Sequence, residues 1–278
     1  MSLSLSSEHR CFDGTQRFYV HESRECRTEM RFSVFVPPQA RTRQVPVLYY
    51  LAGLTSTEET FMIKAGAQRI AAQLGIMLVA PDTSPRKARV AGDDAAWDFG
   101  LGAGFYVDAS EPPWSQHYRM YSYVTRELPE IVDSFGNAAA DRQGIFGHSM
   151  GGHGALVCAL KNPDRYRSVS AFAPISSPSE VPWGQKAFTG YLGSDRSAWA
   201  QYDASALAAR GFDKPILIDQ GMADKFLAEQ LQPHKFEQVC REAGIELKMR
   251  YQDGYDHGYY FISTFVEDHL LHHAAMLR

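Results

Sequence analysis

Residues 143–156 read QGIFGHSMGGHGAL, and this stretch decides the fold. A short apolar run leads into Gly147-His148-Ser149-Met150-Gly151, and small residues follow where a helix is expected to begin. A strand, a sharp turn at G-x-S-x-G and a helix together form a nucleophile elbow. Glycine is required there because the turn strains the serine backbone and leaves no room for side chains two residues to either side. The stretch therefore predicts Ser149 as a nucleophile.

Strands and helices alternate on both sides of this elbow. Nearly unbroken apolar runs predict strands that helices cover on both faces. The predicted strands are 45–51, 76–82, 143–149, 168–174, 215–221 and 245–254, and the predicted helices are 60–74, 118–135, 151–161, 225–243 and 258–275. An alternating segment at 25–37 predicts an antiparallel strand. We therefore expect one α/β domain over 1–278 with the α/β-hydrolase fold: a mostly parallel central sheet, helices on both faces and an antiparallel N-terminal strand.

Two aromatic-rich segments, 83–117 and 174–200, show neither helical nor strand periodicity. Long irregular loops in a compact domain are usually functional or disordered, and aromatic residues argue against disorder. We expect both segments to cover the active site. Trp97 and Trp183 lie in them, and the sequence is equally compatible with substrate contact and with ordinary loop packing.

A serine nucleophile needs a base and an acid, which follow it in the order acid, then histidine. His257, in DGYDHGYYF, comes directly after the last predicted strand and is the expected base. Two residues compete for the acid, because Asp219 lies at a strand end and Asp224 lies in the following loop. The loop position favours Asp224 and a structural role for Asp219, without excluding the reverse.

The tetrahedral intermediate requires two backbone N–H donors. Met150, directly after the nucleophile, should supply one. Leu54, in the loop after the early strand, should supply the other on position alone.

A metal site is the main alternative chemistry that the histidines raise. His269, His272 and His273 recur at helical spacing and could bind zinc. The chain contains no HExxH and no CxxC, so we expect no metal and interpret this cluster as a solvated helix face.

Composition argues against some classes of partner and indicates a cellular compartment. The net charge of −4 argues against nucleic acid. The chain has four scattered cysteines, no signal-peptide-like start and no run of ~18 apolar residues. We therefore expect free thiols, no membrane association and a cytoplasmic location.

Beyond single motifs, the chain resembles the S-formylglutathione hydrolase (esterase D) family over nearly its whole length. The resemblance implies the triad Ser149, Asp224 and His257, and thus favours Asp224 over Asp219. It implies oxyanion donors at Leu54 and Met150, no cofactor or metal, a cytosolic enzyme and often a homodimer. The segments that carry it are LAGLTSTEETF, PDTSPR, WDFGLGAGFYVDAS, HYRMYSYV, GHSMGGHGAL, PWGQKAFTGYLG, IDQGMADKFL and YDHGYYF.

The resemblance also implies an activity, the hydrolysis of the thioester S-formylglutathione to formate and glutathione in formaldehyde detoxification. Ser56 stands where many members carry a cysteine beside the oxyanion loop, and we expect Ser56, Trp97 and Trp183 to contact substrate. A general carboxylesterase acting on small acyl esters is the nearest alternative, since the same triad cleaves both bonds. A non-catalytic binding protein on a hydrolase scaffold is disfavoured because all three triad residues are present.

Overall fold

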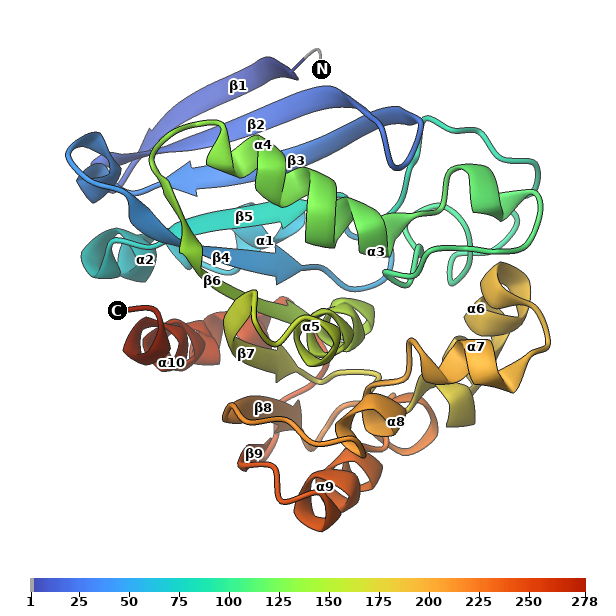
Figure 1. The fold of residues 1–278 in the computed structure, drawn as a ribbon. Coiled ribbons are helices and arrows are strands. Elements are labelled where there is room, and N and C mark those ends of the chain that lie inside the picture. The colour runs from blue at the N-terminus through green and yellow to red at the C-terminus, as the bar shows by residue number, and fades with distance from the viewer. Residues whose placement is uncertain (1–2) are drawn as a thin grey trace.

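The computed structural model describes residues 3–278, which form a nine-stranded sheet in the order β1-β2-β3-β5-β4-β6-β7-β8-β9 (Figure 1). Neighbouring strands are parallel from β5 through β9, whereas β1, β2 and β3 pair antiparallel with one another and β3 with β5. The predicted fold class is confirmed. The strands are β1 (Leu3–Cys11), β2 (Gly14–Ser23), β3 (Thr28–Val36), β4 (Val45–Leu51), β5 (Met77–Pro81), β6 (Ala138–His148), β7 (Tyr166–Phe172), β8 (Ile216–Gly221) and β9 (Leu247–Gln252).

Helices cover both faces of this sheet, which explains the unbroken apolar runs. All residues of β5 and β8 are buried. Helix α5 packs on β4, β6 and β7, while α10 packs on β7 and β8 and also contacts α2 (Figure 1). The helices are α1 (Thr60–Lys64), α2 (Gln68–Leu74), α3 (Met120–Ser122), α4 (Leu128–Asp133), α5 (Met150–Lys161), α6 (Pro182–Leu192), α7 (Arg196–Ala200), α8 (Ala204–Ala208), α9 (Pro233–Glu242) and α10 (Tyr259–Met276).

Three predictions about local structure are wrong. The helix expected over 225–243 is broken at Gln232, which has φ +42° and precedes α9. The helix expected over 60–74 is divided into α1 and α2, with Gly66 between them at φ +68°. The segment 174–200 is not irregular, because it contains α6 and α7. Helix α6 buries Trp183, Ala187 and Tyr191, which are four residues apart, although its glycines obscure that period.

The predicted solvated face of α10 is also wrong. His269 and His273 are fully buried against β7, and His272 is half-buried. Both ring nitrogens of His273 bond hydroxyls, Nδ1 that of Ser168 (2.6 Å) and Nε2 that of Ser170 (2.9 Å). The histidines fit inside because the strand beneath them supplies polar partners.

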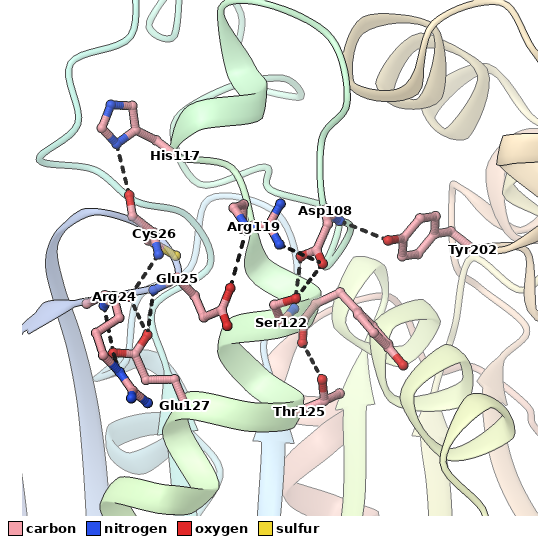
Figure 2. A network of polar contacts seen from close by, with 12 residues as sticks. Arg24, Glu25, Cys26, Asp108, His117, Arg119, Ser122, Thr125, Glu127 and Tyr202 are labelled. Atoms are coloured by element: carbon pink, nitrogen blue, oxygen red, sulfur yellow. Dashed lines mark hydrogen bonds and ion pairs between the residues drawn. The ribbon is translucent and has the colours of Figure 1, made fainter.

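The segment 83–117 contains no α-helix and no strand of the sheet, as predicted. Polar contacts attach its end to the rest of the fold (Figure 2). Asp108 accepts a hydrogen bond from the backbone N–H of Ser122 (2.9 Å) and pairs with Arg119. The buried carboxylate of Glu127 accepts from the backbone N–H of Glu25 (3.0 Å), which joins the β2–β3 turn to the helical segment after the loop. The loop is therefore fixed at its base although it lacks regular structure.

Candidate active site

Ser149 lies between β6 and α5 in a strained backbone conformation, with φ 58° and ψ −119°. A positive φ at a non-glycine residue is costly and is maintained only by close surroundings. Here the surroundings are backbone: a Cβ on Gly147 would lie 2.2 Å from the carbonyl oxygen of Gly151, and one on Gly151 would lie 1.9 Å from that of Leu51. The two glycines of the motif thus allow the turn to close, and the turn presents Ser149 at the carboxyl edge of the sheet.

His257 and Asp224 form a close pair at the same edge. Asp224 follows β8, His257 lies between β9 and α10, and their Nδ1 and Oδ2 atoms are 2.5 Å apart. The Asp224 side chain is fully buried, and its Oδ1 accepts the backbone N–H of Phe226 (2.8 Å). A carboxylate held in this way fixes the imidazole orientation and stabilises the imidazolium form, as a triad acid must.

Ser149 and His257 line one cavity, and no hydrogen bond joins them in this structure. In enzymes without substrate, the bond between nucleophile and base is often long and tightens only in the substrate complex. Asp219, the other candidate acid, lies away from this cavity and is bound by Arg250, Gln252 and His269. The geometry therefore supports Asp224 as the triad acid.

The two predicted oxyanion donors have free N–H groups. Within residues 3–278, neither Leu54 nor Met150 donates its backbone N–H to any acceptor. Met150 is the first residue of α5, where a helix leaves its N–H groups unpaired. A Cβ on Gly53 would lie 3.2 Å from Cβ of Ser149, so the loop carrying Leu54 directly adjoins the nucleophile. Both donors are available to an oxyanion.

Arg86 holds the loop that carries Leu54, a contact that sequence reasoning missed. Its Nη2 donates to the carbonyl oxygen of Ser56 (2.8 Å), and its Nε donates to both carboxylate oxygens of Asp82 (2.9 and 3.0 Å). On the same loop, Thr55 has φ +68° and donates its N–H to the carbonyl of Gly102 (2.9 Å). The oxyanion loop is thus anchored from outside the cavity.

The cavity measures about 220 Å³ and is mainly apolar and aromatic. Trp97 contacts Trp183 edge to face (5.6 Å between centroids), Trp183 contacts Phe226 (4.7 Å), and Phe226 contacts His257 (5.1 Å). Trp183 is buried, whereas Trp97 is 57% exposed. The structure thus brings both predicted tryptophans and Ser56 to the nucleophile. The lining residues are Gly53, Leu54, Ser56, Trp97, His148, Ser149, Trp183, Phe226, His257 and Tyr259.

His148, Phe226 and Tyr259 line this cavity without having been predicted. The ring of His148 lies 4.4 Å from that of His257, and its Nε2 is buried without a hydrogen-bond partner. Burial, and secondarily the nearby His257, hold the pKa of His148 well below its ordinary value. A neutral His148 adds no positive charge to the cavity. The position of His148 directly before Ser149 in the sequence was the available signal that it lines the cavity.

Comparisons with known proteins agree with this geometry. A family model described as "Putative esterase" matches residues 23–272. S-formylglutathione hydrolase of Mus musculus is 54% identical over 100% of this chain and 99% of its own length. The chain belongs to the S-formylglutathione hydrolase family. The Rattus norvegicus S-formylglutathione hydrolase is 52% identical over the same shares. The solved structure of an S-formylglutathione hydrolase from Agrobacterium tumefaciens matches with a TM-score of 0.95 and 49% identity, covering 99% of both chains.

Among residues 3–278, no three or more His, Cys, Asp or Glu side chains are placed to hold a metal ion. In the same part of the chain, no helix is both long and apolar enough to cross a membrane.

Proposed function

We propose that this chain hydrolyses S-formylglutathione to formate and glutathione through a covalent formyl-enzyme on Ser149. The observation that carries the proposal is the 2.5 Å pair of His257 and Asp224 beside Ser149 in one small cavity. Membership of the S-formylglutathione hydrolase family supports the choice of substrate.

Each residue has one role in the proposed reaction. Ser149 Oγ attacks the formyl carbon while Nε2 of His257 takes the hydroxyl proton, and the resulting oxyanion accepts the N–H groups of Leu54 and Met150. The C–S bond then breaks, and His257 returns the proton to the departing thiolate, which leaves as glutathione. Water attacks the formyl ester by the same steps and releases formate and free Ser149.

The size of the cavity favours the smallest acyl group. At about 220 Å³ it is smaller than the ~300–1,000 Å³ of most small-molecule sites. Trp183 is held in place because its backbone N–H donates to the side-chain oxygen of Gln230 (2.9 Å). A rigid wall of this kind should penalise each added methylene of the acyl group.

An acyl series tests this proposal. Formyl, acetyl and butyryl thioesters of glutathione should give falling kcat/KM, by about 10–200-fold for the first misfit carbon, after division by their uncatalysed hydroxide rates. Trp183→Ala should flatten the acetyl-to-butyryl step. A flat corrected profile in the unmodified protein would instead favour the general carboxylesterase.

The same proposal includes the cellular location, the pathway, the absence of a cofactor and the oligomeric state. We place the enzyme in the cytoplasm, in formaldehyde detoxification, without a cofactor. The four cysteines are free, and burial raises the pKa of Cys26, Cys158 and Cys240, which fits a reducing compartment. We also propose a homodimer, which light scattering would distinguish from a monomer.

A further inference from the structure

A second cavity, of about 370 Å³, adjoins the oxyanion loop. Leu54 and Ser56 line the cavity of Ser149, whereas the next residues of the same loop, Thr57, Glu58 and Glu59, line the second. Its remaining walls come from the start of β3 and the segment after β5, with the charged residues Glu29, Arg31, Asp82, Arg86 and Lys87. The two cavities therefore share one loop and differ sharply in charge.

Most charges in this second cavity pair with one another. Arg86 pairs with Asp82, and Arg31 lies 3.4 Å from Glu29. Glu58 is different: it is 6% exposed, and among residues 3–278 its carboxylate makes no ion pair and no hydrogen bond to another residue. Burial, and then the charge of Asp82, raise the pKa of Glu58. A buried carboxyl group without a partner that faces an open cavity is suited to bind an incoming cation.

A metal ion does not fit this position. Within the described part of the chain no three acidic, cysteine or histidine side chains converge, and Asp82 is already occupied by Arg86. An ammonium group, which needs only one carboxylate and directional acceptors, fits better. Lys87 is exposed and makes no ion pair in residues 3–278, so it is available for a carboxylate of the same ligand.

The apolar cavity of Ser149 leaves the charges of the proposed substrate without partners. None of its ten lining residues is Lys, Arg, Asp or Glu, whereas a glutathione thioester carries a primary ammonium and two carboxylates. We infer that the cavity beside the oxyanion loop binds the γ-glutamyl end of the peptide leaving group, with its ammonium on Glu58 and its carboxylate toward Lys87. This inference rests on the proposed function, because it names where that substrate's peptide part lies.

The opposite rim of the active site offers a partial alternative. Lys225 lies over the ring of Phe226 (4.9 Å) and can attract a carboxylate, but the nearby Asp98 is paired with Lys186. Glu229 and Asp256, close in sequence to Phe226 and His257, make no ion pair within residues 3–278, but both are exposed to water, whereas Glu58 is buried. Binding of the ammonium, rather than of the carboxylates, therefore distinguishes the cavity at Glu58 from the rim at Lys225 as the place of the γ-glutamyl end.

The test compares S-formylglutathione with its N-acetyl derivative, which lacks the ammonium. In the unmodified protein, and in the control Glu246→Gln with its exposed carboxylate at the far edge of the sheet, acetylation should lower kcat/KM by about tenfold or more. In Glu58→Gln it should cost less than about twofold. Both substrates are measured on the same preparation, so loss of folded protein cancels from each ratio. A loss below twofold in the unmodified protein, or a full loss retained in Glu58→Gln, overturns the inference.

Binding of the free peptide separates this inference from the proposed function. Glutathione and N-acetylglutathione are titrated into each protein and followed by NMR, without any turnover. Tighter binding of glutathione that disappears in Glu58→Gln supports the cavity even if S-formylglutathione proves not to be the substrate. Equal binding of the two peptides to the unmodified protein contradicts the cavity while leaving the hydrolase activity standing.

Discussion

The molecule contains two groups of serine, histidine and aspartate, and they have opposite surroundings. Ser149, His257 and Asp224 lie at the carboxyl edge of the sheet around a cavity. Ser170 on β7 and Asp219 on β8 lie beneath α10, which carries His269, and all three are fully buried. In the buried group Nε2 of His269 contacts Asp219 (2.9 Å) and Nδ1 contacts the Ser170 hydroxyl (2.8 Å), the reverse of the triad arrangement.

The surroundings of the buried group also shift the pKa values of its Asp219 and His269. Although burial alone raises it, hydrogen bonds from His269 and Arg250 hold the pKa of Asp219 below its ordinary value. Burial lowers the pKa of His269, so the neutral ring donates to Asp219 and accepts from Ser170. No substrate can reach this serine. The same three residue types thus occur twice in one fold, and of the two groups only the one at the sheet edge is accompanied by a strained turn, free N–H donors and a cavity, the features that a catalytic site requires.

The largest expected effect is the difference in kcat between variants of the two serines. Ser149→Ala should lower kcat by about 10³–10⁶-fold because the triad acts as a unit. Ser170→Ala should retain most activity in the folded protein and lower the free energy of unfolding, because it removes a hydroxyl that bonds both His269 and His273. Steady-state kinetics and urea unfolding measure the two effects. A Ser149→Ala protein with a tenth of the normal rate would exclude the covalent mechanism.

The next largest effect is the difference in kcat between variants of the two aspartates. Asp224→Asn should lower kcat by up to ~10⁴-fold, since the amide no longer fixes the imidazole tautomer. Asp219→Asn should cost little rate but about 2–3 kcal/mol of unfolding free energy, because it weakens hydrogen bonds to charged Arg250 and to His269. The same two assays apply, and the opposite ranking would exchange the roles of the aspartates.

Arg86 should have a smaller effect on the rate. Arg86→Met removes the guanidinium that holds the Ser56 carbonyl, so the N–H of Leu54 should be less well placed. We expect kcat to fall about tenfold with little change in KM, because this interaction serves the transition state, and losing an entire oxyanion donor costs ~10²–10³-fold. Arg86→Lys should recover part of the loss. A change confined to KM would contradict this role.

The smallest effect concerns acid stability and reports on His273, which bonds the Ser170 hydroxyl of the buried group. Burial, and then the charges of His272 and His269, hold the pKa of His273 well below the ~6.5 of an unfolded histidine. The unfolded chain therefore binds the extra proton, so the stabilisation is complete above about pH 6.5 and is lost as the pH falls. Between pH 6.5 and 5, His273→Gln should lower the slope of unfolding free energy by up to about 1.4 kcal/mol per pH unit, with the full effect toward pH 5. The exposed His9→Gln control should leave the slope unchanged, and an unchanged slope in His273→Gln would show that His273 titrates normally.

The sequence located the residues that the structure brings together at the carboxyl edge of the sheet better than it located the buried network, for physical reasons. The elbow and the loop holding His257 are local features, because glycine spacing and the end of a strand determine them. The choice between Asp219 and Asp224 remained open from the residues alone, since both follow the same apolar run. The burial of His269 and His273 had a signal in the sequence, because both continue the apolar stripe of Ile262, Val266 and Leu270 at helical spacing. Their polar partners had none, since Ser170 lies 99 residues away from His269.

Other features could not be predicted from the sequence for similar reasons. Helix α6 was missed because Gly184 and Gly190 interrupt its apolar period, yet the first packs against Pro178 and the second against Phe99. The contact between Arg86 and Ser56 joins two loops and has no sequence signature. Tertiary contacts between irregular segments, rather than propensity, determine these parts of the site.

Labelling with a fluorophosphonate, followed by peptide mass spectrometry, tests the central claim most directly. The reagent reports which serine is both activated and accessible. We predict a single adduct on Ser149, no adduct on Ser170, labelling slowed by Asp224→Asn and labelling unchanged by Asp219→Asn. An adduct on any other serine, or full activity in protein whose Ser149 is completely labelled, would contradict the account.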